Sequence, residues 1–271
     1  MPPLLSRRYA PWSFFALAAV VGIAALLFPR TPQPLSYHQF ADTRSWLGIP
    51  NFGDVASNIL FLAAGLCGLV FLCRKSNRER FIEARERWPY FLLFLGLLLT
   101  ACGSAYYHLS PDNARLVWDR VPMTAVFMPL VAALIAERVS VSIGLWLLPV
   151  FTAVGIASVL QWHFSEQQGA GDLRCYAAVQ LYAVLALFVV LLLPQRYTRG
   201  SDLLVVAGLY ALAKVCETAD RPIFSWGHLV SGHTLKHLAA GAAGLYILRM
   251  LQKRQPVSQH GMYPAAEPTA H

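Results

Sequence analysis

The sequence predicts an all-α fold, a polytopic membrane helix bundle, on two observations. Hydrophobic residues make up 56% of the 271 positions and charged residues only 13%, whereas a soluble domain carries about 25% charged residues. Apolar runs of about 17 to 20 residues recur along the chain, which is the length that a helix needs to cross a bilayer core. These runs predict helices near 12–28, 55–73, 89–108, 119–137, 142–161, 176–193, 203–219 and 229–250.

The first predicted helix, 12–28, follows Arg7 and Arg8 as a signal peptide would. No Ala-x-Ala cleavage site comes after it, so we expect an uncleaved helix that adds to a core of seven. The connections between the runs are short, which favours one transmembrane domain over residues 1–251. Residues 252–271 hold three prolines and few apolar side chains, and they are expected to form a disordered cytoplasmic tail.

The lysines and arginines of the connecting segments predict the orientation. With a cytoplasmic N-terminus, the inside segments collect Arg7, Arg8, Arg74, Lys75, Arg78, Arg80, Arg85, Arg87, Arg138, Arg196, Arg199, Arg249, Lys253 and Arg254, and the outside segments hold Arg30, Arg44, Arg115, Arg120, Arg174 and Arg221. This excess predicts that both termini are cytoplasmic, in the inner membrane if the protein is bacterial. The net charge of +8 is then mainly a topology signal, and it does not indicate a nucleic-acid partner.

Four ionisable residues interrupt the apolar runs, where such groups are costly and usually functional. His108 ends the run 89–108, Asp119 begins the run 119–137, and His233 and His237 lie in the first half of the last run. In the predicted topology all four lie at the non-cytoplasmic ends of their helices. Residues far apart in sequence thus share one membrane depth, so we expect the site to open toward the non-cytoplasmic side.

The spacing of these residues predicts a metal site. His233 and His237 are four residues apart and lie on one helical face, as do Ser104 and His108. Three histidines and a water are the ligands of a catalytic zinc, which lowers the pKa of that water to about 7. Asp119 could then orient the water or carry its proton, and Ser104 could donate a hydrogen bond to a developing oxyanion.

Other interpretations of the histidines stay open at this point. A histidine at a membrane interface is often just a satisfied polar side chain, and facing histidines on two helices also suit a haem. His163 and His228 are alternative ligands at the same outer face, but neither has a second histidine one turn away.

Three motifs resemble those of the alkaline ceramidases. They are GSAYYH at 103–108, WDRVPMT at 118–124 and GHTLKH at 232–237. This family belongs to a superfamily of membrane hydrolases that includes the adiponectin and progestin receptors and the Per1 proteins. Its pattern is S-x-x-x-H, a following Asp, and H-x-x-x-H on a seven-helix core, and the resemblance extends from about residue 42 to about residue 249.

The resemblance implies zinc on His108, His233 and His237, with Ser104 and Asp119 contacting the catalytic water. The implied activity is hydrolysis of a ceramide-like N-acyl lipid to a sphingoid base and a fatty acid. A second hypothesis is a zinc-containing receptor or lipid-binding protein without turnover. A transporter is a third, for which the charged helix 203–219 is the only hint. Acyl-chain preference and oligomeric state are not predicted.

The chain departs from the family pattern in two places. Animal alkaline ceramidases bind calcium just before their first core helix, where this chain offers Asp42, Asn51 and Asp54. Calcium takes six to eight oxygen ligands, so a complete site is not expected, and the three residues can instead serve as caps and turns. Lys236 stands between the two histidines where an aromatic is expected, and its long side chain could snorkel outward.

A further polar group lies on the run 203–219 and just after it. Lys214, Glu217 and Asp220 recur every three residues and so share one helical face. They predict either a structural ion-pair network or a set of contacts that holds the last helix and its ligands from behind. The five cysteines include no C-x-x-C pair, so neither a disulfide framework nor a cysteine metal site is indicated.

Overall fold

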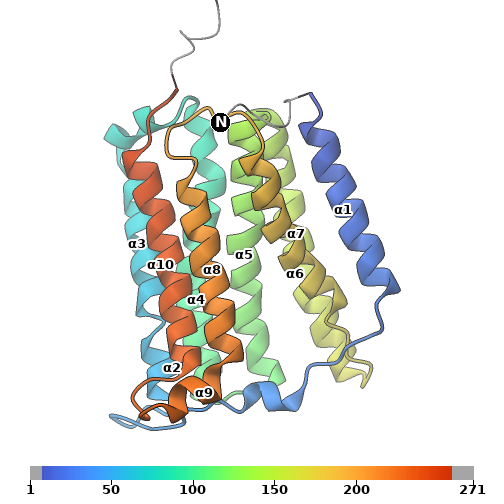
Figure 1. Cartoon of the computed structure of the whole chain (residues 1–271), viewed down its shortest axis with the longest axis vertical. Helices are drawn as coiled ribbons and strands as arrows, with labels where there is room; N and C mark the ends of the chain where they lie inside the picture. The colour runs from blue at the N-terminus through green and yellow to red at the C-terminus, as the bar shows by residue number, and fades with distance from the viewer. Residues whose placement is uncertain (1–7, 258–271) are drawn as a thin grey trace, which may run out of the picture.

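The computed structural model describes residues 8–257 as a bundle of roughly parallel and antiparallel helices (Figure 1). The helices are α1 (Ala10–Leu27), α2 (Phe52–Ala56), α3 (Ile59–Cys73), α4 (Arg87–Leu109), α5 (Asn113–Arg138), α6 (Val141–Gln167), α7 (Arg174–Leu191), α8 (Asp202–Thr218), α9 (Asp220–Ser225) and α10 (Gly232–Lys253). Within these residues the only β-type pairings are two isolated bridges. The predicted all-α class is therefore confirmed.

The observed helix ends differ from the predicted ones where polar residues cap a helix. α5 begins at Asn113, six residues before Asp119, because the Asp112 carboxylate accepts a hydrogen bond of 2.7 Å from the backbone N–H of Arg115. α6 continues to Gln167, beyond the apolar run that ends near residue 161. Hydropathy marks the apolar part of a helix, whereas capping decides where the helix ends.

Six segments are long and apolar enough to cross a membrane: Ala10–Leu27, Phe52–Cys73, Ala84–Leu109, Asn113–Arg138, Val141–Gln167 and Arg174–Leu191. α8, with 17 residues, and α10, which carries the two histidines and Lys236, lie beside them in the same bundle (Figure 1). Large apolar side chains such as Trp12, Trp146 and Val215 are more than half exposed. Such a surface suits lipid rather than water, and it supports a membrane protein.

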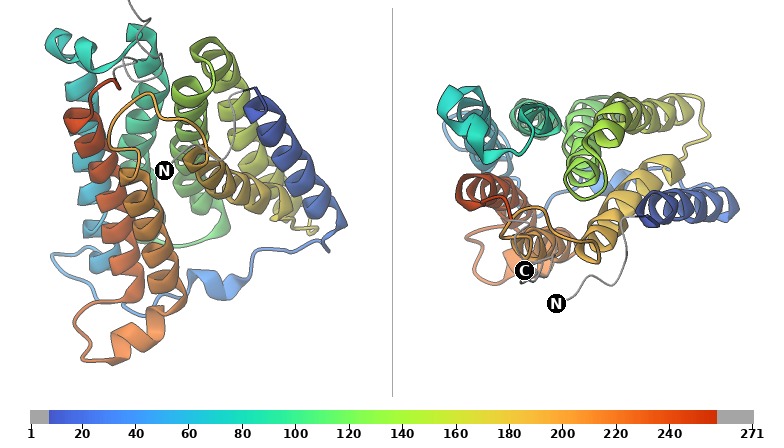
Figure 2. Two further views of the ribbon diagram at one scale, coloured as in Figure 1. Left: turned by 45° about the horizontal axis from the view of Figure 1, so that its top comes forward. Right: turned by 90° about the horizontal axis from the view of Figure 1, so that it is seen from above.

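Figure 2 shows the bundle from above, with the helices side by side. α4 packs against α3 and α5, α5 packs against α6, and α10 packs against α8 and α3. α1 lies at the edge of the bundle against α7 (Figures 1 and 2). This position agrees with the prediction of one helix added to a seven-helix core.

Gly103 on α4 brings α4 and α5 into close contact near the predicted site. A Cβ at this position would lie 1.9 Å from the backbone oxygen of Trp118, which is far inside van der Waals contact. Small residues allow helix backbones to approach in this way in membranes. Because Ser104 follows Gly103 and Asp119 follows Trp118, the close approach sets both side chains at the same helix crossing.

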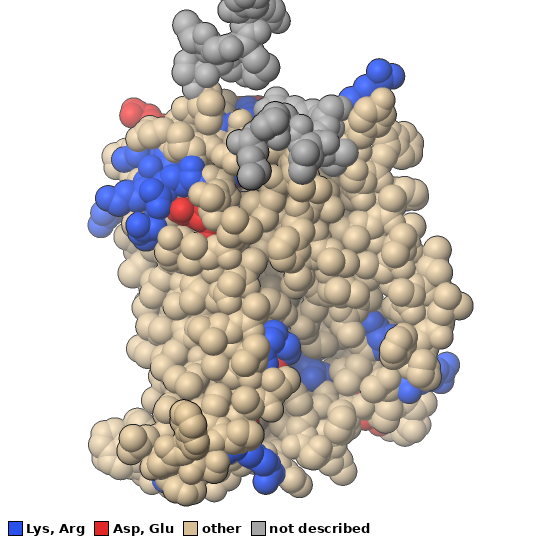
Figure 3. All heavy atoms as spheres, viewed as in Figure 1, with Lys and Arg blue, Asp and Glu red and all other residues tan. Residues whose placement is uncertain are grey.

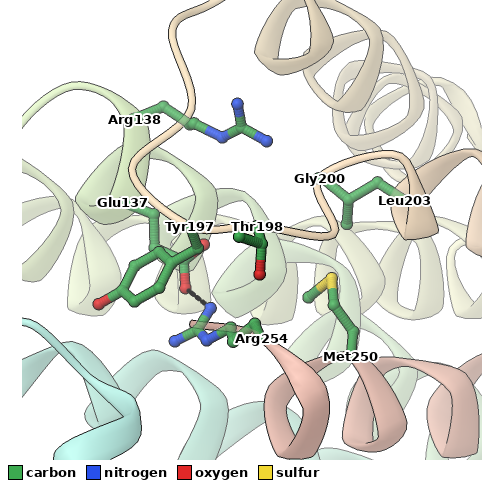
Figure 4. Close-up of a pocket in the computed structure, with 8 residues that line it drawn as sticks. All are labelled: Glu137, Arg138, Tyr197, Thr198, Gly200, Leu203, Met250 and Arg254. Carbon is green, nitrogen blue, oxygen red and sulfur yellow. Dashed lines mark hydrogen bonds and ion pairs between the residues drawn. The ribbon is translucent and has the colours of Figure 1, made fainter. Parts of the chain in front are cut away.

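The opposite end of the bundle is held by a buried ion pair between Arg254 and Glu137 (Figure 4). The Arg254 guanidinium also stacks 3.9 Å from the ring centroid of Tyr197, and the Tyr197 hydroxyl donates to Glu86. The disordered tail was predicted to begin at residue 252, but α10 continues to Lys253 and Arg254 is 1% exposed. A buried charge with a partner orders this segment. Residues 258–271 of the predicted tail and Arg7 lie outside the described residues.

Candidate metal centre

Three buried histidines meet at the end of the bundle formed by α2, α9 and the start of α10. The ring centroids of His108 and His233 are 4.8 Å apart, those of His108 and His237 4.9 Å, and those of His233 and His237 4.8 Å. One ring nitrogen from each lies within 4.8 Å of the others. The cluster could therefore hold a metal ion, as the histidine spacing predicted.

The N-terminus of α10 is positioned by acceptors from two sides. The Ser231 hydroxyl accepts a hydrogen bond of 3.0 Å from the backbone N–H of Thr234, as an N-cap. The Asp220 carboxylate accepts 2.8 Å hydrogen bonds from the backbone N–H groups of His233 and Ala41. Asp220 thus ties the helix that carries two of the histidines to the segment before α2.

The orientation of the His237 ring is set by α2. Nδ1 of His237 lies 2.9 Å from Oγ of Ser57 and 3.1 Å from the backbone oxygen of Asp54. A carbonyl oxygen only accepts hydrogen bonds, so Nδ1 carries the proton and donates it. Nε2 then keeps its lone pair for a metal, which is the usual arrangement of a metal-binding histidine.

The other two rings are packed by Phe40 and lack hydrogen-bond partners. The Phe40 centroid lies 4.7 Å from that of His108 and 4.4 Å from that of His233. Both ring nitrogens of His108 and Nε2 of His233 are buried without a hydrogen bond in the described part of the chain. Buried polar atoms are costly when unsatisfied, and a metal ion held by one nitrogen of each ring removes part of that cost. The residues present therefore fit a three-histidine metal site.

Ser104 and Asp119, the two predicted catalytic residues, are both buried. Ser104 is 1% exposed and Asp119 6% exposed, and the two side chains are close enough to interact. Both line the same cavity as His237. A hydroxyl, a carboxylate and a metal-binding imidazole are thus gathered on one wall.

This cavity has a volume of about 590 Å³ and lies between α4, α5, α7, α8 and α10. Most of its wall is apolar, with Leu97, Phe127 and Ile247 among the lining residues. The size is within the range of sites for small molecules, about 300 to 1,000 Å³. Apolar walls beside a polar cluster suit a ligand with a hydrocarbon chain and a polar head.

The three predicted calcium donors lie near one another, and each has protein partners. Arg44 donates 2.7 Å hydrogen bonds to both carboxylate oxygens of Asp42, and the Asn51 side chain donates to the backbone oxygen of His108. Asp54 is fully buried and accepts a 2.8 Å hydrogen bond from the Thr234 hydroxyl. An ion at this place would have to displace Arg44 from Asp42, and the expectation of an incomplete calcium site stays a prediction.

Both predicted roles of the polar group on and after α8 are found, an ion-pair network and contacts to α10, but in different residues of Lys214, Glu217 and Asp220. Glu217 pairs with Lys214 and, at 2.7 Å, with Lys236 of α10. Asp220 instead holds the backbone of His233. Lys236 does not snorkel outward: its side chain is 14% exposed and lines the cavity, because Glu217 offers it a buried partner.

The alternative ligands do not join the cluster. His163 hydrogen-bonds Gln167 at 2.9 Å, and His228 lies in the turn after α9 with a φ of 55°. All five cysteines are free thiols. The metal cluster among residues 8–257 consists of His108, His233 and His237 alone.

Sequence reasoning missed Ser57, Phe40 and the part that Asp54 plays in orienting His237. The only signal was Asp54 itself, which the sequence offered as a calcium donor. A scan of protein-family models finds no match to this chain, and a search of curated proteins finds none either.

Proposed function

We propose that this protein is a zinc-dependent intramembrane amidase that cleaves ceramide-like N-acyl lipids to a sphingoid base and a fatty acid. One observation carries the proposal: His237, Ser104 and Asp119 share the wall of a largely apolar cavity of about 590 Å³. The resemblance of the three motifs to the alkaline ceramidases supports the same chemistry. The excess of basic residues in alternate loops supports cytoplasmic termini and a site toward the non-cytoplasmic side.

Different residues of the site have different roles in the proposed hydrolysis of the amide. His108, His233 and His237 would hold the zinc, which activates water for attack at neutral pH. The Asp119 carboxylate accepts a proton from the attacking water and passes it to the leaving amine nitrogen as the C–N bond breaks. The Ser104 hydroxyl lies on the same cavity lining and would donate its hydrogen bond to the carbonyl oxygen of the amide. The apolar wall holds the acyl chain.

Metal analysis of the purified protein tests the ligand set. We expect about one zinc per chain in the wild type and a large loss in His233→Ala. His163→Ala is the matched control, since this partly exposed histidine lies outside the cluster, and it should keep the metal. Equal zinc in the wild type and His233→Ala would overturn the assignment.

Turnover separates the enzyme from the second candidate, a zinc-containing receptor or lipid-binding protein. An enzyme and a receptor would both use the same cavity and the same histidines. Incubation with a panel of N-acyl lipids should release free fatty acid from the wild type and not from Asp119→Asn. No release from any lipid by zinc-loaded protein would favour the receptor.

A further inference from the structure

Arg120 is a buried guanidinium without an acidic partner. It follows Asp119 on α5, is 5% exposed and lines the same cavity. Its Nη2 donates a 2.6 Å hydrogen bond to the neutral side-chain oxygen of Gln33, whereas Nη1 has no hydrogen-bond partner among the described residues. No ion pair of residues 8–257 includes Arg120. A buried charge is costly unless an opposite charge compensates it.

Aromatic rings hold Arg120 in place without neutralising it. The guanidinium carbon lies 4.3 Å from the ring centroid of Trp162, 4.8 Å from that of Tyr176 and 5.5 Å from that of Tyr37. Cation–π contacts of this kind stabilise a desolvated cation. They leave the full positive charge available to a ligand in the cavity.

The other charged residues of the cavity wall balance one another, so the charge of Arg120 is left in excess. The charged lining residues are the three basic groups Arg120, Lys214 and Lys236 and the two acids Asp119 and Glu217, so three minus two leaves one positive charge. Both lysines share Glu217, and Asp119 is engaged with Ser104. Figure 3 shows Lys and Arg side chains in a hollow near the middle of one face, apart from the larger basic group at the upper left.

We propose that the amide lipid of this cavity carries an acid group, a carboxylate or a phosphate, on its head beside the scissile bond, and that Arg120 binds it. Lys236 adds a second positive charge to the same subsite. The proposal rests on the proposed function and names its substrate class. A neutral ceramide head would leave Arg120 uncompensated, whereas a guanidinium is well suited to carboxylate and phosphate groups.

Competition between matched lipids tests this subsite by native mass spectrometry of the full chain. The pairs are N-oleoylglycine against N-oleoylethanolamine, and ceramide 1-phosphate against ceramide, each at equal concentration. We expect the acidic member of at least one pair to occupy the protein about tenfold more, as a charge-assisted hydrogen bond gives. The carboxylate and phosphate pairs identify which acid is preferred. Equal or lower occupancy by the acidic member in both pairs overturns the proposal.

Substitutions test whether the preference for the acidic lipid depends on Arg120. Arg120→Gln should abolish it, while Arg221→Gln, which removes an exposed charge at the same end of the bundle, should keep it. Because Arg120→Gln could disturb folding, Arg120→Lys and Lys236→Gln provide second tests: the first should retain part of the preference and the second should reduce it. A full preference in both Arg120→Gln and Lys236→Gln overturns the proposal.

The binding measurement does not require turnover, so the two proposals fail separately. An acidic lipid that binds through Arg120 but is never cleaved contradicts the amidase and leaves the anion subsite standing. Cleavage of neutral lipids with no preference for an acidic head contradicts the subsite alone.

Discussion

Oγ of Ser57 lies 2.9 Å from Nδ1 of His237. Ser57 donates its own proton to the backbone oxygen of Asp54 at 3.0 Å, so its oxygen is free to accept from the imidazole. A short helix, α2, thereby selects which nitrogen of His237 faces a metal. Contacts behind a metal ligand commonly tune its affinity in this way.

Ser57→Ala should weaken metal binding about 10- to 100-fold, because the His237 ring loses one of its two orienting partners. Titration of the purified protein against a competing chelator measures the change. Ser142→Ala, an exposed serine at the other end of the bundle, should leave the affinity unchanged. An unaltered affinity in Ser57→Ala would show that the backbone oxygen of Asp54 orients the ring alone.

Asp119→Asn should lower the hydrolysis rate about 10²- to 10⁴-fold while the zinc content stays near that of the wild type. The amide keeps the size of the side chain and removes its ability to accept a proton. Fatty-acid release and metal analysis on the same preparation check both parts. A variant that loses its zinc together with its activity would point to a ligand role for Asp119 instead.

Gly103→Ala should destabilise the protein by about 1–3 kcal/mol, because the added methyl group meets the backbone oxygen of Trp118 and forces α4 and α5 apart. Activity should fall with it, since Ser104 and Asp119 lie at that crossing. Thermal unfolding in detergent measures the first effect. Gly208→Ala is the control, because nothing lies within 4 Å of a Cβ on Gly208, and it should have little effect.

Arg254→Met should lower the free energy of unfolding by about 3–5 kcal/mol, because it leaves the buried Glu137 carboxylate without its cation. The double variant Arg254→Met, Glu137→Gln should recover part of the loss, since no buried charge remains unpaired. Unfolding temperatures of the wild type and both variants give the comparison. A double variant less stable than Arg254→Met would contradict this account.

The hydrogen bonds from the Arg44 guanidinium hold the pKa of Asp42 below its ordinary value of 3.8. A lowered pKa stabilises the folded state above that ordinary value, and the contribution is lost as the pH falls through the folded pKa. Between about pH 5 and about pH 3, the unfolding temperature of the wild type should therefore fall more than that of Asp42→Asn. Parallel curves would show that this pair contributes nothing to stability.

Much of the bundle could be predicted from hydropathy alone, because a membrane helix must satisfy its backbone internally and cover itself with apolar side chains. The helix positions and the pairing of His233 with His237 both depend on local spacing. The end of α10 could not be predicted, because Arg254 pairs with Glu137 and Pro256 forms a bridge with Tyr197, both from distant segments. The amino-acid composition near residue 254 does not reveal an ion-pair partner that lies far away in the sequence.

For the candidate site, the sequence by itself determined which residues are candidates, since ionisable side chains in apolar helices stand out against their surroundings. Only the tertiary structure decided what supports them. Ser57 behind His237, Phe40 against two of the rings, and Arg120 among three aromatic rings are contacts between residues far apart in the chain. They depend on how the helices pack, and that packing brings three histidines into a cluster that could hold a metal, beside a cavity with charged lining residues.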